Sequence, residues 1–331
     1  MRVLITGSNG LLGQKLVHKL RIDELVELIA TSKGENRISE KIGYNYISLD
    51  ITEKEELEKV ILSENPDVII NTAAMTNVDD CEDKKQECDA LNIDAVQCLT
   101  DISEQIDAHL IHISTDFIFD GKNSPYTEDA IPNPLSYYGL SKLKSETLLL
   151  ESSCRWTVLR TIIVFGVAEN LSKGNIVLWA KCELEKGEKL NIIDDQFRSP
   201  TLAEDLADAC ILSFQKQKYG VYNTSGKEIM SIYEIVERIA KHYNYSTENL
   251  NRISTSTLNQ LATRPPKTGF ILDKSIKVSP PHLQDQIIFS TSSSIDDVTV
   301  EFPILVFTFT KKFVYKKLYA ENFRMKPCQK M

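Results

Sequence analysis

The chain has 331 residues, of which 42% are hydrophobic, so it is long enough to bury the core of one large lobe or two smaller ones. Its formal net charge of -9 argues against binding to nucleic acid or to a membrane surface, because both require concentrated positive charge. No apolar run approaches the roughly 20 residues that span a bilayer. Seven scattered cysteines without metal-like spacing predict reduced thiols and no metal site, so we expect a cytoplasmic protein.

The first two-thirds of the sequence alternates short β-branched runs with amphipathic helical patterns, which is typical of parallel βαβ units. We expect strands at residues 2–6, 25–30, 46–49, 67–71, 109–114 and 157–160. Thr52 and Glu55 have the spacing of a capping box at the start of the helix that follows the third strand. The pattern predicts an α/β fold with a Rossmann-type, doubly wound parallel sheet.

Beyond residue 165 the alternation becomes less regular. We expect a helix at 175–186, a strand at 191–193, a helix after Thr201, a strand at 220–223 and a helix after Ser231. The expected divisions are a Rossmann domain at 1–165, a smaller C-terminal α/β lobe at 166–286 and an atypical basic tail at 287–331. The tail has seven Lys or Arg against four Asp or Glu, and it is either a partner-binding arm or a poorly packed extension.

A glycine-rich segment, Gly7-Ser8-Asn9-Gly10-Leu11-Leu12-Gly13, lies between the first expected strand and the first expected helix. Glycines at this place permit a tight turn and let backbone N–H groups approach a pyrophosphate, whose charge the helix N-terminus stabilises. The segment therefore predicts a dinucleotide-binding loop. The expected cofactor contacts in it are Gly7, Asn9, Gly10, Leu11, Leu12 and Gly13.

The residues after the second strand indicate which dinucleotide binds. An acidic residue there would bind the ribose hydroxyls of NAD. Here Ser32 and Lys33 offer a hydroxyl and an ammonium, which suit the 2′-phosphate of NADP(H) better and leave NAD(H) as the alternative. Further cofactor contacts are expected at the ends of the third and fourth strands, from Asp50, Ile51, Ala73, Ala74 and Thr76.

Tyr138 and Lys142 stand four residues apart, which places them on one face of a predicted helix. A nearby ammonium stabilises a phenolate and lowers the tyrosine pKa from its usual value of about 10, so the pair can give a proton to a carbonyl group. Thr115 follows the fifth strand, at the carboxyl edge of the sheet where ligands bind. Thr115, Tyr138 and Lys142 are therefore the candidate catalytic residues.

With these motifs the chain resembles the extended short-chain dehydrogenase/reductase family, and within it the dTDP-4-dehydrorhamnose reductase-like, sugar nucleotide-binding branch. The resemblance covers about residues 1–278 and is carried by residues 7–13, 71–79, 114–121, 138–142, 159–161 and 195–201. Two residues depart from the branch. Leu11 replaces a polar residue of the glycine loop, and Met75 stands where an aromatic residue is usual.

The resemblance implies NADPH-dependent reduction of a nucleotide-linked 4-keto-deoxysugar. Tyr138 would be the general acid, Lys142 would hold the nicotinamide ribose and lower the tyrosine pKa, and Thr115 would hydrogen-bond the substrate carbonyl. The smaller lobe would bind the sugar nucleotide. Substrate contacts are expected from Thr115, Asp116, Phe117 and Arg198, and Arg198 and Arg264 either meet the diphosphate or form surface ion pairs.

Two other functions remain open at this stage. One is a related epimerase or dehydratase, which would retain its NAD tightly. The other is a non-catalytic, NADP-binding regulatory subunit, because a relative of this family serves methionine adenosyltransferase in that way. The intact set of Thr115, Tyr138 and Lys142 favours the reductase, Asn92 is expected to be structural, and a homodimer is an open alternative to a monomer.

Overall fold

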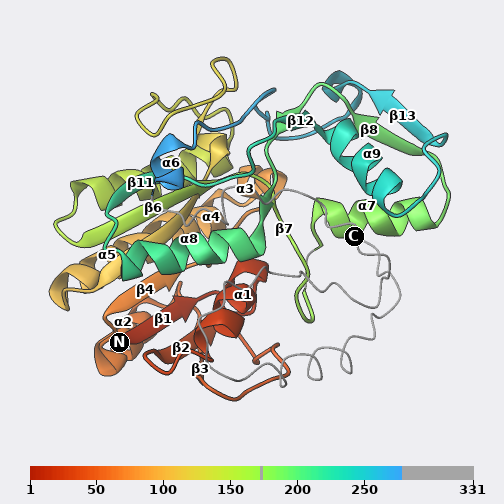
Figure 1. Ribbon diagram of the computed structural model, residues 1–331. Helices are drawn as coiled ribbons and strands as arrows, with labels where there is room; N and C mark the ends of the chain where they lie inside the picture. The colour runs from red at the N-terminus through yellow and green to blue at the C-terminus, as the bar shows by residue number, and fades with distance from the viewer. Residues whose placement is uncertain (172–173, 278–331) are drawn as a thin grey trace.

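The computed structural model describes residues 1–171 and 174–277 and centres on a seven-stranded parallel sheet with the strand order β11-β6-β5-β4-β1-β2-β3 (Figure 1). Its strands are β1 (Arg2–Thr6), β2 (Glu27–Ser32), β3 (Asn45–Ser48), β4 (Val68–Asn71), β5 (His109–Thr115), β6 (Arg155–Thr161) and β11 (Gly220–Asn223). Strand β1 pairs with β2 on one side and with β4 on the other, so the strand order reverses there. In open α/β sheets, ligands bind beyond the carboxyl ends of the strands at such a point.

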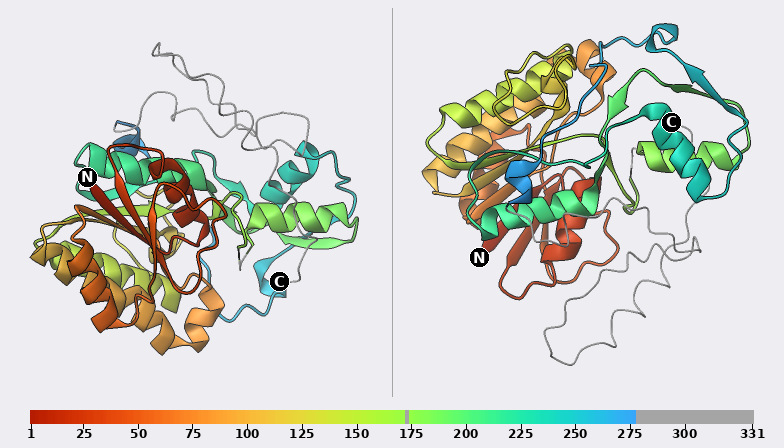
Figure 2. Two further views of the ribbon diagram at one scale, coloured as in Figure 1. Left: turned by 90° about the horizontal axis from the view of Figure 1, so that it is seen from below. Right: turned by 45° about the horizontal axis from the view of Figure 1, so that its top comes forward.

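Helices cover both faces of this sheet, as the left view of Figure 2 shows. One face carries α1 (Leu11–Leu20) and α8 (Ala203–Gln215), and the other carries α2 (Lys54–Glu64), α5 (Ala95–Gln105) and α6 (Tyr137–Glu151). Alternate residues of β1 point to opposite faces of the sheet, and each face has its own apolar core. Ile5 packs with Leu16 of α1, whereas Leu4 packs with Leu57 of α2. The predicted Rossmann-type α/β fold is therefore confirmed.

The smaller lobe lies beyond the ends toward which the central strands run (Figure 1). It consists chiefly of α7 (Ile176–Glu185), β8 (Leu190–Ile193), α9 (Ile232–His242) and β13 (Leu250–Ile253). Strands β8 and β13 pair in parallel, and the two helices contribute Leu184 and Val236 to one apolar core. Ser231 and Glu234 form a reciprocal capping box that fixes the start of α9.

Short elements connect these parts. They are α3 (Val78–Asp83), α4 (Lys85–Asp89), the π-helical turn η1 (Ala90–Asp94), η2 (Asp116–Ile118), β7 (Val164–Phe165), β9 (Phe197–Arg198), β10 (Thr201–Leu202), β12 (Met230–Ser231), η3 (Thr255–Thr257) and α10 (Asp273–Ile276). The pairs β7–β10 and β9–β12 form two small sheets between the central sheet and the smaller lobe.

Three local expectations differ from the structure. The second strand begins at Glu27 rather than residue 25, because Glu27 is the residue that pairs with Arg2. The capping box at Thr52 is wrong, because the Thr52 hydroxyl donates to Asp50 Oδ1 at 2.7 Å and α2 starts after Glu53 without a side-chain cap. Strand β11 completes the central sheet from the segment assigned to the smaller lobe, and the division at residue 165 stays a prediction.

Five cysteines are free thiols, namely Cys81, Cys88, Cys98, Cys154 and Cys210. Cys182 is disulfide-bonded, so the prediction of a reduced thiol is wrong for that residue. Cys328 and the predicted basic tail lie outside the described residues. Within residues 1–171 and 174–277, no helix is long and apolar enough to cross a membrane, and no group of three His, Cys, Asp or Glu side chains could hold a metal ion.

Candidate active site

The glycine-rich segment forms a tight turn between β1 and α1. Gly7 has a left-handed φ of +70°, and a Cβ there would lie 2.8 Å from the backbone nitrogen of Ala73. A Cβ on Gly13 would collide with the carbonyl oxygen of Gly7. The two glycines therefore let α1 begin directly against the end of β1, which is the arrangement of a pyrophosphate site.

Helix α1 begins without a side-chain cap, because Gly10 occupies its N-cap position, and its first turn holds no acidic residue. The N–H groups of this turn are therefore available to an anion, whose charge the helix dipole stabilises. Asn9 braces the turn: its Nδ2 donates to the Glu35 carbonyl at 2.8 Å, and its Oδ1 accepts from the Arg37 N–H at 2.9 Å.

Lys33 and Asp50, two of the expected cofactor contacts, bind each other, with Lys33 Nζ 2.6 Å from Asp50 Oδ2. Burial opposes ionisation of Asp50, but hydrogen bonds from Lys33 and Thr52 hold its pKa below the usual value. Ser32 ends β2 beside them. A hollow of about 700 Å³ adjoins this strand end and is lined by Gly34, Glu35, Asn36, Lys41, Tyr44, Tyr46 and Ser48. Its size suits the adenosine part of a dinucleotide.

The remaining expected cofactor contacts have small or apolar side chains. Ala73 and Ala74 follow β4 and are half-buried, whereas Thr76 is exposed. Leu12 and Ile51 pack in the core, so their side chains are not available to a ligand.

Thr115 and Tyr138 meet where β5 ends and α6 begins. Gly139 allows this approach, because a Cβ there would collide with the carbonyl oxygen of Phe117. The Phe117 ring packs edge-on against the Tyr138 ring, with centroids 5.7 Å apart. The Thr115 hydroxyl donates to Asp116 Oδ1 at 3.1 Å, and it lies near enough to the Tyr138 phenol to lower the pKa of that phenol. The two hydroxyl groups therefore lie near each other at the carboxyl edge of the sheet.

The surroundings of Tyr138 keep its phenol protonated. Burial raises the pKa of Tyr138; the nearby Thr115 hydroxyl lowers it, and the Asp116 carboxylate raises it. The net pKa lies above the ordinary value. The phenol therefore holds the proton that a general acid must give.

Lys142 lies one turn after Tyr138 and is almost completely buried, with 2% of its surface exposed. Its Nζ lies 2.8 Å from Nε2 of His112. Burial lowers the pKa of Lys142 to about 7, although Glu146 and Cys88 act to raise it. Among the residues that the structure describes, no acidic side chain forms an ion pair with Lys142, so its ammonium form is only weakly stabilised.

His112 extends the site into the sheet. Its Nδ1 lies 3.1 Å from Asn71 Nδ2, and Asn71 Oδ1 accepts from the Thr6 hydroxyl at 2.6 Å. Burial and the neighbouring Lys142 hold the pKa of His112 well below its usual value. The sequence analysis missed His112, although the available signal was a polar residue within the apolar run of the fifth strand.

Asn92 links the site to the helices beneath it. It lies in η1, where its Oδ1 accepts from the Met75 N–H at 2.8 Å and its Nδ2 donates to Ser141 Oγ at 3.0 Å. Ser141 in turn donates to the carbonyl oxygen of Tyr138 at 2.8 Å. These contacts fit the expected structural role of Asn92, because they fix the first turn of α6 against the segment that follows β4.

Asp116 and Arg198 face each other in the interior rather than in an open cleft. Both are 2% exposed, and Arg198 Nε lies 3.8 Å from Asp116 Oδ2. Arg198 also donates to the carbonyl oxygens of Phe197 and Pro265, each at 2.7 Å. Burial raises the pKa of Asp116, against the effects of Arg198 and of a hydrogen bond from Thr268. The donors of Arg198 are therefore largely engaged within the protein.

The segment from Ala262 to Ile271 closes this side of the site. Arg264 forms a bidentate ion pair with Asp79, with Nη1 3.1 Å from Oδ1 and Nη2 2.7 Å from Oδ2, instead of pointing into a free cleft. Thr268 donates to Asp116 Oδ2, and the backbone N–H of Ile271 donates to the carbonyl oxygen of Tyr126 at 2.8 Å. Residues late in the chain thus brace the loop that follows β5.

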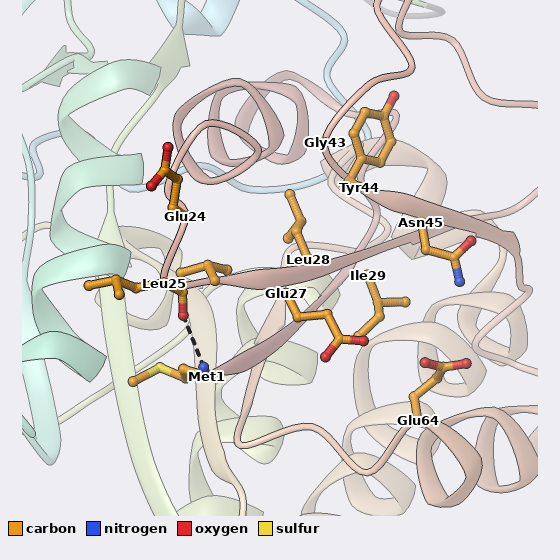
Figure 3. Close-up of a pocket in the computed structure, with 11 residues that line it drawn as sticks. Met1, Glu24, Leu25, Glu27, Leu28, Ile29, Gly43, Tyr44, Asn45 and Glu64 are labelled. Carbon is orange, nitrogen blue, oxygen red and sulfur yellow. Dashed lines mark hydrogen bonds between the residues drawn. The ribbon is translucent and has the colours of Figure 1, made fainter.

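A separate hollow of about 540 Å³ lies at the opposite edge of the sheet, around the start of β1 and β2 (Figure 3). It is lined by Met1, Leu25, Glu27, Tyr44, Asn45 and other residues, and the amino group of Met1 donates to the Leu25 carbonyl at 2.9 Å. The glycine loop and Tyr138 do not line it. It is therefore not the dinucleotide site.

Comparison with known proteins agrees with this arrangement. Residues 1–285 match the family described as the RmlD substrate binding domain. A dTDP-4-dehydrorhamnose reductase from Aggregatibacter actinomycetemcomitans is 33% identical over 286 residues, covering 82% of this chain and 91% of the relative. Methionine adenosyltransferase 2 subunit beta from Bos taurus is 31% identical, covering 77% of this chain and 76% of the relative.

Solved structures give the same result. A hypothetical dTDP-4-dehydrorhamnose reductase from Sulfolobus tokodaii has a TM-score of 0.75 and 31% identity, covering 84% of this chain and 95% of that one. The dTDP-4-dehydrorhamnose reductase from Bacillus anthracis, solved in complex with NADP, has a TM-score of 0.72 and 26% identity, covering 84% and 92%. The chain thus belongs to the RmlD substrate binding domain family, within the extended short-chain dehydrogenase/reductase type.

Proposed function

We propose that this protein uses NADPH to reduce a nucleotide-linked 4-keto-deoxysugar, with Tyr138 as the general acid. The observation that carries the proposal is that Tyr138 lies near Thr115 at the carboxyl edge of the sheet, with the buried Lys142 one turn further along the same helix and a glycine turn that fits a pyrophosphate after β1. The 33% identical relative named as a dTDP-4-dehydrorhamnose reductase supports the choice of substrate class.

The proposed reaction adds a hydride and a proton to one carbonyl group. A bound nicotinamide would supply the hydride to the carbonyl carbon. Tyr138 gives its phenol proton to the carbonyl oxygen, so the ketone becomes an alcohol and a phenolate remains. Thr115 donates a hydrogen bond that orients the carbonyl, and an ammonium on Lys142 stabilises the phenolate.

The cofactor residues take the roles that their positions favour. Gly7, Gly10, Gly13 and the N–H groups of α1 hold the pyrophosphate, as the uncapped helix start allows. Ser32 and Lys33 would bind the 2′-phosphate, and this phosphate would replace Asp50 as the partner of the Lys33 ammonium. The other residues expected to border the bound cofactor are Asn9, Leu11, Leu12, Asp50, Ile51, Ala73, Ala74 and Thr76. Leu12 and Ile51 would do so through their backbone, because their side chains pack in the core.

The substrate residues divide into contacting and positioning groups. Thr115 and the half-buried Phe117 border the reacting sugar. Asp116 and Arg198 are positioning residues for the loop that follows β5. The guanidinium of Arg198 is already engaged with backbone carbonyls and with the Asp116 carboxylate, so it is not available to the substrate. A cytoplasmic location remains a proposal, and assembly as a homodimer remains an open alternative to a monomer.

The test is to incubate the protein with NADPH and a panel of nucleotide 4-keto-deoxysugars while following nicotinamide absorbance. We expect oxidation of NADPH that depends on one member of the panel and is lost in Tyr138→Phe. Tight NADPH binding with no turnover on any sugar would contradict the proposal.

A second candidate is a regulatory subunit of methionine adenosyltransferase, which relatives with 30–32% identity favour by their names. Under that reading, the protein would bind a methionine adenosyltransferase catalytic subunit and change its kinetics without turning over NADPH. Mixing the two proteins and measuring both activities separates the candidates.

A further inference from the structure

The hydrogen-bond partners of His112 determine which of its nitrogens carries a proton. Ser145 has one hydroxyl hydrogen, which it donates to the carbonyl oxygen of Lys142 at 2.7 Å. Its oxygen also lies 3.1 Å from His112 Nε2, so at that contact it must accept. The proton of the neutral imidazole is therefore on Nε2.

The other ring nitrogen agrees with this assignment. Asn71 Oδ1 accepts the hydroxyl hydrogen of Thr6, which directs Asn71 Nδ2 at His112 Nδ1, at 3.1 Å. An amide nitrogen donates, so Nδ1 accepts and carries no proton. Thr6, Asn71 and Ser145 together fix one tautomer of His112.

This tautomer constrains Lys142. Its Nζ lies 2.8 Å from the protonated Nε2 of His112. An ammonium has only donors, so it would bring N–H against N–H; a neutral amine has a lone pair and shares the Nε2 hydrogen with Ser145 Oγ in a bifurcated hydrogen bond. The depressed pKa of Lys142, about 7, agrees with a neutral amine above neutral pH.

We propose that His112 is a positioning residue that holds Lys142 as a neutral amine, so that binding of NADPH draws one proton from solvent onto Lys142. The proposal rests on the cofactor site of the proposed function. It has a chemical reason: the phenolate left on Tyr138 is stabilised by an ammonium and not by an amine. The hydroxyl oxygens of a ribose accept hydrogen bonds from that ammonium, so the bound cofactor favours the charged form.

Other titratable groups face Lys142 and must be separated from it. Tyr138 and Glu146 lie on its own helix, Cys88 comes from α4, and His112 comes from β5. Glu146 is held by Arg160 of β6 at 2.7 Å. Hydrogen bonds from Cys81, Ser141 and Asn92 lower the pKa of Cys88 to about 7, against the effect of burial, so this thiol titrates in the same range as Lys142.

The experiment measures protons rather than turnover. NADPH is titrated into the purified protein in weak buffer at about pH 8, with a pH indicator as the readout. A lysine with a pKa near 7 is then mostly neutral, so we expect uptake of about 0.9 proton per bound NADPH and weaker binding as the pH rises. Cys88→Ser should leave the uptake unchanged, and Lys142→Met should abolish it.

His112→Gln is the decisive variant, because its amide can turn its oxygen toward an ammonium and so favours the charged lysine. If the lysine pKa rises by about one unit, uptake at about pH 8 falls to about 0.5 proton. His109→Gln is the matched control: His109 is also buried on β5, but its Nε2 contacts Thr157. It should take up as many protons as the wild type.

Three results would overturn the proposal: no proton uptake by the wild type, loss of uptake in Cys88→Ser, or unchanged uptake in His112→Gln. If His112→Gln does not fold, the wild type, Cys88→Ser and Lys142→Met still decide whether Lys142 takes up the proton, so a wild type without uptake overturns the proposal. The measurement needs no sugar. A protein that takes up the proton but reduces no 4-keto-sugar would overturn the proposed reaction and leave this inference standing, and one that binds no NADPH would overturn both.

Discussion

Helix α6 carries two buried ionisable groups one turn apart, and their surroundings differ. The carboxylate of Glu146 accepts from Nε and Nη2 of Arg160, at 3.0 Å and 2.7 Å, and Arg160 also donates to the carbonyl oxygen of Glu128. Lys142 contacts the neutral ring of His112 instead. The charge of Glu146 is compensated within the protein, whereas Lys142, the proposed catalytic lysine, has no acidic partner among the described residues.

The largest effect on stability is expected from breaking the ion pair of Arg160 and Glu146. Arg160→Met removes the cation and leaves the carboxylate of Glu146, which is 1% exposed, without its partner. We expect a loss of about 3–5 kcal/mol in the free energy of unfolding, measured by urea denaturation. The double variant Arg160→Met/Glu146→Leu should regain most of it, because no buried charge then remains. A double variant as unstable as the single one would show that the pair does not act through charge.

Tyr138→Phe should have the next largest effect, on turnover rather than on stability. Removing the phenol oxygen leaves the ring to pack against Phe117 and deletes the proposed proton donor. We expect the turnover number to fall by ~100-fold or more while the Kd for NADPH barely changes. Tyr137→Phe is the matched control, since the neighbouring phenol donates to Asp89 at 2.8 Å outside the proposed reaction. Near-normal turnover in Tyr138→Phe would mean that another group gives the proton.

Lys142→Met sharpens the contrast with Arg160. It removes a buried amine that has no acidic partner among the described residues, so the free energy of unfolding should stay level or rise. Turnover should nevertheless fall by about tenfold or more, and NADPH should bind more weakly. Lys144→Met, on an exposed position of the same helix, should change none of these quantities. Marked destabilisation by Lys142→Met would mean that Lys142, like Arg160, stabilises the fold.

The smallest effect is expected at the pair of Lys33, which is exposed, and Asp50, which is half-buried. Lys33→Ala should weaken binding of NADPH by less than about tenfold and leave NADH unchanged, because only NADPH has the 2′-phosphate. The wild type should bind NADPH more tightly than NADH. Fluorescence titration of both cofactors measures this, with Lys59→Ala on α2 as the control. Equal affinities of the wild type for the two cofactors would refute the assignment of Ser32 and Lys33.

Local patterns made much of the fold predictable. The glycine turn and the helix start at Asn175 follow from residues close together in the sequence. The capping box at Thr52 failed for a local reason too, because Asp50 competes for the same hydroxyl. Side-chain competition of this kind is difficult to foresee from spacing alone.

The parts of the site that depend on distant residues were not predictable. The contact of His112 with Lys142 requires α6 to pack on β5, and nothing in either segment alone specifies it. The interior position of Arg198 likewise depends on Pro265, which lies 67 residues away. A sequence shows that an arginine is suited to a diphosphate, but not that backbone carbonyls already occupy its donors.

The bracing of the loop after β5 by residues 262–271 also has a consequence for how the protein is made. Thr268 reaches Asp116 across 152 positions, and Arg264 reaches Asp79 across 185. During synthesis the Rossmann strands up to β6 can pair while these braces are still inside the ribosome. A nascent chain can thus form its glycine turn early, but the loop after β5 is braced only after about residue 271 has emerged.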